Sequence, residues 1–164
     1  MKILWIIKSS RKEKNKDATE KQLEEKRIIS SGSSWFLAIG ILSAISIIAV
    51  ITKQNFYFFL GLGINSVIIG IMHGIYQSLG INIMIIGYIL TFLISGLFAL
   101  IWKKSKDGDR KMYLTGLIIY SIDTVIFLFA KEWVALGFHV FALIGIYMGY
   151  KKLLERIKAV GKTK

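Results

Sequence analysis

The sequence lacks cysteine and proline altogether. Without cysteine, disulfide bonds, thiolate catalysis and thiolate metal sites are all excluded. Acidic residues are also scarce, since 10 Asp and Glu stand against 22 Lys and Arg in 164 residues, which gives a formal net charge of +12. Together with a hydrophobic fraction of 54%, this composition excludes most classes of soluble protein.

Established catalytic motifs are missing as well. The chain contains no HExxH pattern, no GxSxG nucleophile motif and no Walker phosphate-binding loop. We therefore expect neither a cofactor nor a metal, and the sequence favours a non-enzymatic role.

The charged residues that are present lie in a few blocks separated by long apolar stretches. A helix needs about 20 apolar residues to cross roughly 30 Å of hydrocarbon. Trp35, Trp102 and Trp133 fall at the ends of such stretches, where indole rings favour the membrane interface. The pattern predicts an all-α membrane protein with a helical bundle over residues 35–150 and basic cytoplasmic tails over 1–34 and 151–164. The five apolar segments are Trp35–Thr52, Phe56–Leu79, Ile81–Trp102, Met112–Ala130 and Trp133–Tyr150.

The distribution of Lys and Arg tests how many of these segments cross, because short cytoplasmic loops are enriched in cations. Nine cations precede Trp35, five lie between Lys103 and Lys111, and six follow Tyr150. Five crossings would place 10 cations on one side of the membrane and 12 on the other. Four crossings would place 20 on one side and only Lys53 and Lys131 opposite them. The charge bias therefore predicts four transmembrane helices in the cell membrane, with both termini cytoplasmic; five helices are the alternative.

The segment that best fits the non-crossing role is Asn55–Leu79. Gly61 and Gly63 interrupt it, which predicts a short helix, a Gly-x-Gly break and a second helix that re-enters the membrane or lies along its interface. Because interrupted backbone at membrane depth needs a polar or protein environment, this segment should pack among the other helices. Polar and small residues recur along one face of its second half, at Ser66, Gly70, His73, Gly74 and Gln77.

The tails are highly charged. Asp17 and Glu20 match a capping box, which predicts a helix from Ala18 to about Ile29 that is interrupted by Ser30–Ser34. A solvated or headgroup-facing tail is favoured over a helix that docks a partner, and residues 151–164 are expected to continue the last helix. The apolar run at the start of the chain is too short for a signal peptide, so we expect the N-terminus to be retained.

The basic blocks also indicate partners. Cations beside apolar spans attract lipid bilayers with anionic headgroups, at about 1 kcal/mol per cation. No nucleic-acid-binding fold accompanies the charge, so nucleic acid is not an expected partner.

Small residues at helical spacing predict close helix packing in lipid. They support a compact bundle, and leave open whether the chain also binds another membrane protein or forms a homo-oligomer. The positions are Gly40 and Ala44; Gly70 and Gly74; Gly87, Thr91, Ser95 and Ala99; and Gly145 and Gly149.

Asp123 is the only acidic residue within a predicted span, where a charge costs about 2.5–3.5 kcal/mol on insertion scales. Asp123 lies nearly as many residues before the Lys131–Glu132 turn as His139 lies after it. The two residues would therefore differ in depth within the membrane by only about 1.5 Å. We therefore predict an Asp123–His139 hydrogen bond or ion pair. Further candidate partners are Tyr120, Thr124, His73 and Asn65.

This polar pair has two interpretations. The favoured one is structural, a pair that keeps the last two helices in register. The other is functional, a proton relay or cation site, because Asp and His in a bundle can titrate near physiological pH. A metal site that adds His73 is disfavoured, because the sequence spacing gives no indication that the three residues come together.

Three stretches, Phe59–Ile64, Tyr120–Asp123 and Phe138–Leu143, carry a resemblance that extends over about residues 35–150. Across them the chain resembles small polytopic membrane proteins of bacteria that have no assigned activity. The resemblance implies a multi-pass membrane protein and supplies no mechanism.

Three functions remain as hypotheses. The first is a non-enzymatic accessory or interaction protein, of which immunity to a membrane-active peptide is one form. The alternative is a small proton- or cation-coupled transporter or channel that uses Asp123 and His139. An intramembrane enzyme with Asp, His and Tyr as acid and base ranks third.

Single-cysteine labelling tests the predicted topology, since the chain has no native Cys. With an impermeant maleimide, Lys53→Cys and Gln77→Cys should react in intact cells, whereas Lys106→Cys and Lys162→Cys should react only after the membrane is opened. Reaction of position 106 and the N-terminus from opposite sides of the membrane would contradict four crossings.

Overall fold

The computed structural model describes the backbone of residues 2–52, 61–80 and 83–161, and within these ranges the side chains of all residues except 2–12, 14, 15 and 18. The described residues form five α-helices and no strand. The helices are α1 (Lys2–Ile51), α2 (Gly63–Leu79), α3 (Met84–Lys106), α4 (Arg110–Ala130) and α5 (Trp133–Gly161).

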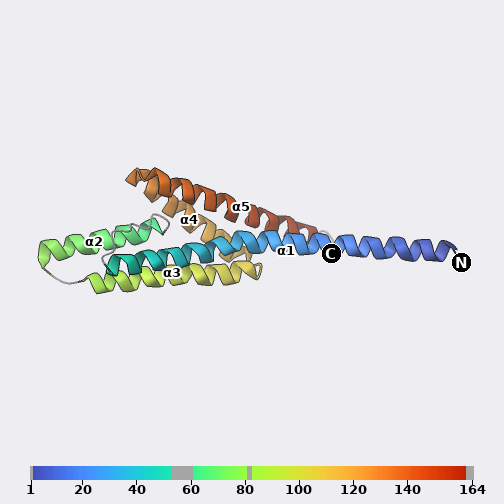
Figure 1. Cartoon of the computed structure of the whole chain (residues 1–164), viewed down its shortest axis with the longest axis horizontal. Helices are drawn as coiled ribbons and strands as arrows, with labels where there is room; N and C mark the ends of the chain where they lie inside the picture. Colours follow the sequence, from blue (N-terminus) through green and yellow to red (C-terminus); the bar gives the residue numbers. More distant parts are fainter. Residues whose placement is uncertain (1, 53–60, 81–82, 162–164) are drawn as a thin grey trace.

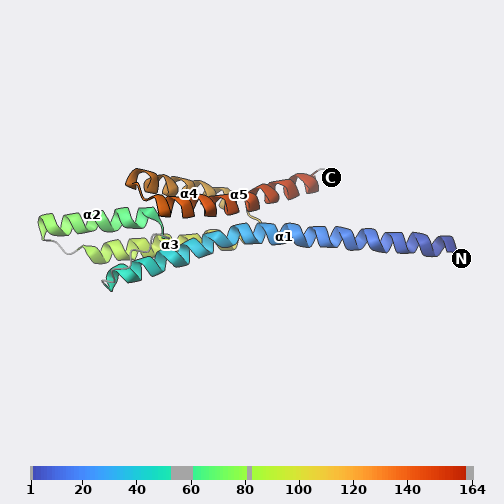
Figure 2. The ribbon, with the colours of Figure 1, turned by 45° about the horizontal axis from the view of Figure 1, so that its top comes forward.

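The C-terminal half of α1 forms a bundle with α3, α4 and α5, while its N-terminal half extends away from the bundle alone (Figures 1 and 2). Helix α1 packs against α3 and α5, and α4 packs against α5 and α3. The α3–α4 turn and the C-terminal end of α5 lie at the end of the bundle from which α1 extends (Figure 1). The three cationic blocks of the sequence therefore belong to one end of the molecule.

Four helices are long and apolar enough to cross a membrane, namely α3, α4, α5 and the part of α1 from Thr19 to Ile51. The remaining helix, α2, has only 17 residues. Large apolar side chains on the outer faces of the bundle are exposed, including Leu93 at 65%, Ile122 at 64% and Phe141 at 62%. The structure confirms the predicted all-α membrane protein of four spanning helices and one additional helical segment.

Helix α2 begins inside the bundle. The Leu62 N–H, just before it, donates a hydrogen bond to Ser43 Oγ at 2.9 Å. Ser43 lies about 13 Å along α1 from Thr52, so the chain returns by that distance before α2 starts. Helix α2 then runs outward past the ends of α1, α4 and α5 (Figures 1 and 2). Relative to the bundle, the described part of the segment thus has a re-entrant course, since it starts inside and leaves at the end where α1 finishes. The short helix predicted before Gly61 falls on residues 53–60, outside the described ranges.

Gly61 and Gly63 are needed where the re-entrant chain passes between α1 and α4. A Cβ added to Gly61 would lie 2.8 Å from Ser46 Oγ, and one added to Gly63 would lie 2.9 Å from Phe127 Cε2. Real Cβ atoms do not approach other heavy atoms so closely. The two glycines therefore provide the space that the chain needs just before α2 and at its first residue.

The predicted start and interruption of the N-terminal helix are wrong. Helix α1 runs without a break from Lys2 through Ser30–Ser34 to Ile51. The hydroxyls of Ser33 and Ser34 donate to the Ser30 carbonyl at 2.9 and 2.8 Å, within the helix. A Cβ on Gly32 would lie 2.7 Å from Gly149 Cα, so the small residues at this point allow α1 and α5 to approach closely.

Some of the other small residues pack against a neighbouring helix as predicted, and others do not. Gly40 faces the Ser95 carbonyl across the α1–α3 contact, and Gly87 faces Met72 across the α2–α3 contact. Gly70 and Gly74, in contrast, have no described atom within 4 Å of an added Cβ, and Ser66, His73 and Gln77 on the same face are also exposed. The prediction that this segment packs among the other helices therefore holds for the start of α2 and for its contact with α3, and it does not extend to this polar face, which is exposed.

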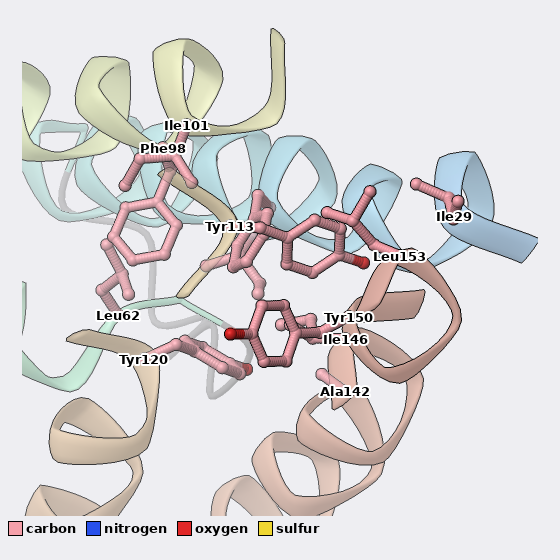
Figure 3. Packing of buried hydrophobic residues seen from close by; sticks show 12 residues of the cluster. Ile29, Leu62, Phe98, Ile101, Tyr113, Tyr120, Ala142, Ile146, Tyr150 and Leu153 are labelled. Atoms are coloured by element: carbon pink, nitrogen blue, oxygen red, sulfur yellow. The ribbon is translucent and has the colours of Figure 1, made fainter. Parts of the chain in front are cut away.

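Aromatic rings fill the centre of the bundle (Figure 3). Phe36 of α1 meets Tyr113 of α4 edge to face, with ring centroids 5.5 Å apart, and Phe98 of α3 meets Tyr120 of α4 at 6.3 Å. These rings join α1, α3 and α4.

Substituting Gly32 should test the α1–α5 contact. Gly32→Leu should lower the free energy of unfolding by about 1–3 kcal/mol, because the larger side chain forces the helices apart. Gly137→Leu is the matched control, since nothing lies within 4 Å of its added Cβ. Thermal unfolding in detergent measures both, and equal melting temperatures for the two variants would contradict the contact.

Candidate functional site

The polar centre of the bundle is built on one face of α4. Tyr120, Asp123 and Phe127 recur at helical spacing, and all three are buried, with Asp123 only 3% exposed. Asp123 lies seven residues before the end of α4, which is about 10 Å. Its carboxylate therefore lies inside the apolar part of the span, where it needs partners.

The carboxylate receives two of its hydrogen bonds from the first turn of α2. The Gly63 N–H donates to Asp123 Oδ2 at 3.0 Å, and the Ile64 N–H donates to Oδ1 at 2.9 Å. The first N–H groups of any helix have no partner within the helix, and the helix dipole makes that end attractive to an anion. Leu62 precedes the helix and offers no side-chain acceptor. Asp123 therefore caps α2 from another helix.

His139 of α5 approaches the same carboxylate. Its Nε2 lies 3.6 Å from Asp123 Oδ2, and both side chains are buried. Its Nδ1 lies 2.8 Å from the Ala135 carbonyl, which can only accept, so Nδ1 carries a hydrogen. Nε2 has no hydrogen-bond partner among the described residues. A second hydrogen at Nε2 would give an imidazolium directed at the carboxylate.

Aromatic rings enclose the His139 ring. Tyr120 stacks on it with centroids 5.1 Å apart, and Phe127 lies at 4.2 Å. The Tyr120 hydroxyl has no hydrogen-bond partner in the described part of the chain, so Tyr120 contributes its ring face to the site. The Thr124 hydroxyl donates to the Tyr120 carbonyl at 2.8 Å and not to the polar pair.

The two remaining predicted partners lie on α2. Asn65 is buried, and its Nδ2 lies 3.4 Å from Ser95 Oγ, so it connects α2 to α3 next to the capped turn. His73 is exposed and pairs with Gln77, the two nitrogens being 2.8 Å apart. It lies about 15 Å along α2 from Gly63. His73 therefore does not join Asp123 and His139, and no metal-binding group of three His, Cys, Asp or Glu occurs among the described residues.

Sequence reasoning missed the most important partners of Asp123, the N–H groups of Gly63 and Ile64. The available signal was the Gly-x-Gly break followed by a helix without an Asp, Asn, Ser or Thr to cap it. An uncapped helix start at membrane depth requires an acceptor from elsewhere, and Asp123 is the only acid within the spans predicted from the sequence.

The site has little free capacity for a ligand. Both carboxylate oxygens accept from the backbone, and aromatic rings cover the imidazole. Two grooves on the surface, between α1 and α5 and between α1 and α3, are lined by neither Asp123 nor His139. The geometry fits a closed structural contact.

Comparisons with protein-family models, with curated proteins and with solved structures give no significant match to this chain. The class defined by the fold is a small all-α integral membrane protein with a re-entrant helix, and its function has to be inferred from its own residues.

Replacing Asp123 should release the start of α2. Asp123→Asn retains one acceptor oxygen and turns an amide toward the second N–H, so we expect a loss of about 2 kcal/mol in the free energy of unfolding. In a Leu62→Cys background, maleimide should then label position 62 faster, since Leu62 is only 2% exposed in the folded chain. Asp107→Asn, an exposed position with the same change of charge, is the control.

A double-mutant cycle with His139→Gln then measures the coupling between the two side chains. We expect the combined loss of stability to differ from the sum of the single losses by about 1 kcal/mol. Additive effects, with unchanged labelling at position 62, would contradict the described contacts.

Proposed function

We propose that this protein is a non-enzymatic accessory or interaction protein of the cell membrane, with both termini in the cytoplasm. The observation that carries the proposal is the closure of the polar centre. Asp123 accepts from Gly63 and Ile64, so the acid that a transport pathway would use is committed to holding α2. Immunity to a membrane-active peptide is one form of this role.

The N-terminal half of α1 supports an interaction role. It extends beyond the bundle without another helix beside it (Figure 2), and the described side chains from Glu13 to Glu24 are exposed. A Lys152–Glu25 ion pair, 3.5 Å between Nζ and Oε1, holds its base against α5. A charged helix that projects about 30 Å from the membrane is available to bind a second protein.

The cytoplasmic orientation is supported by the position of the charges. The α1 extension, the α3–α4 turn and the end of α5 lie at the same end of the bundle (Figure 1). Because cations accumulate on the cytoplasmic side, we place this end there. The same surface is suited to anionic headgroups.

A small proton- or cation-coupled transporter is the second candidate. It is favoured by Nε2 of His139, which has no hydrogen-bond partner in the described part of the chain and lies 3.6 Å from Asp123 Oδ2, beside a helix that begins within the bundle. Helices interrupted at membrane depth also border the transport sites of many carriers.

Photocrosslinking in native membranes tests the interaction role. A benzophenone side chain at Leu23, which is 60% exposed on the α1 extension, should form a discrete protein adduct. The same probe at Val134, which is 78% exposed at the opposite end of the bundle, should not.

Flux measurements on the purified protein in proteoliposomes decide between the two functions. The interaction role predicts proton and cation flux no greater than that of empty vesicles. Flux that is present in the natural chain and lost in Asp123→Asn, with no adduct from Leu23, would establish the transporter instead.

A further inference from the structure

A groove lies between α1 and α5 near the base of the α1 extension. Its volume is about 310 Å³, and its walls include Glu24, Arg27, Ser31 and Trp35 of α1 and Gly145 and Met148 of α5. It is separate from the Asp123 site, and it shares only Glu24 with the exposed stretch of α1 on which the interaction role rests.

The groove is built by side chains held in place. The Trp35 indole packs edge to face on Phe138 and Phe141 of α5, with ring centroids 6.2 and 5.5 Å apart. A Cβ on Gly145 would overlap the indole, so the missing side chain makes room for it. Next to the Trp35 indole, Gly32 of α1 and Gly149 of α5 bring the two helices into contact.

Along the groove, polar wall residues are followed by apolar ones, in the same order as the headgroup and the acyl chains of a phospholipid. Trp35 begins the apolar part of α1, at the depth of the membrane interface. Arg27 lies about 12 Å farther out along the helix, and Glu24 about 4.5 Å beyond Arg27. An acyl chain beside Trp35 and Met148 would therefore place its phosphate near Arg27 and the outer end of its headgroup near Glu24.

Both charged groups are available. Among the described residues, neither Arg27 nor Glu24 takes part in an ion pair. The neighbouring cation of α5, Lys152, is already engaged by Glu25 at 3.5 Å and Glu155 at 3.2 Å. The groove thus presents one cation and, farther from the membrane, one anion.

We propose that this groove binds one zwitterionic aminophospholipid, of the phosphatidylethanolamine type. Arg27 pairs with the phosphate, and Glu24 accepts from the primary ammonium, which an ethylene link separates from the phosphate. An anionic headgroup without an amine would pair with Arg27, but the outer end of that headgroup would lie against the Glu24 carboxylate with no ammonium to donate to it. Charge complementarity therefore selects the aminophospholipid over phosphatidylglycerol.

Native mass spectrometry of the full-length protein tests this proposal, with phosphatidylethanolamine, phosphatidylglycerol and phosphatidylcholine of identical chains. We expect one phosphatidylethanolamine to be retained, with an affinity about threefold or more above that for the other two lipids. Glu24→Gln should remove this preference without weakening phosphatidylglycerol, Arg27→Gln should weaken both lipids, and Ser31→Trp, which fills the groove, should abolish retention.

Glu20→Gln, one turn farther out on α1, and Gly96→Trp, in the separate groove between α1 and α3, serve as matched controls and should retain the lipid as the natural chain does. Circular dichroism and the melting temperature establish that each variant is folded. Equal retention of the three lipids, a preference for phosphatidylglycerol, or binding unaffected by Glu24→Gln and Arg27→Gln would overturn the proposal.

Discussion

The architecture depends on the contact between the Asp123 carboxylate and the first turn of α2. A helix that starts inside a bilayer leaves N–H groups without water, and a carboxylate at that depth is equally costly alone. Each satisfies the other, with hydrogen bonds of 3.0 and 2.9 Å to Gly63 and Ile64. The contact therefore holds the re-entrant segment within a bundle whose other helices are long and apolar enough to cross a membrane.

The second requirement is that the helices approach one another closely. Glycines allow this, because they have no side chain. Gly63 allows the re-entrant chain to reach α4, Gly32 and Gly149 allow α1 to reach α5, and Gly40 allows α1 to reach α3. In lipid there is no hydrophobic force that drives helices together, so such contacts and a few hydrogen bonds supply most of the association. The same small residues shape the α1–α5 groove and keep the Asp123 site closed.

At the polar centre, the positions of side chains along the sequence predicted one partner of Asp123 and missed the others. Nearly equal distances from the Lys131–Glu132 turn placed Asp123 and His139 at similar depths, and the structure brings Nε2 of His139 to 3.6 Å from Oδ2 of Asp123. The backbone donors could not be found in that way, because an N–H group has no signature in the side-chain sequence. His73 was a candidate only because of the chemistry of its imidazole. It lies on an exposed face of α2, and the direction of α2, which the sequence does not state, places it far from Asp123 and His139.

The sequence by itself determined the all-helical class, the four spans and the grouping of the cationic blocks. These properties follow from the composition of single segments, since the cost of placing a residue in hydrocarbon is largely local. Tertiary contacts decided that Ser30–Ser34 continues a helix and that α2 starts at the carboxylate of Asp123. Serine and glycine are compatible with either a helix or a break, and only the neighbouring helix, through the space and the hydrogen bonds that it offers, selects between the two.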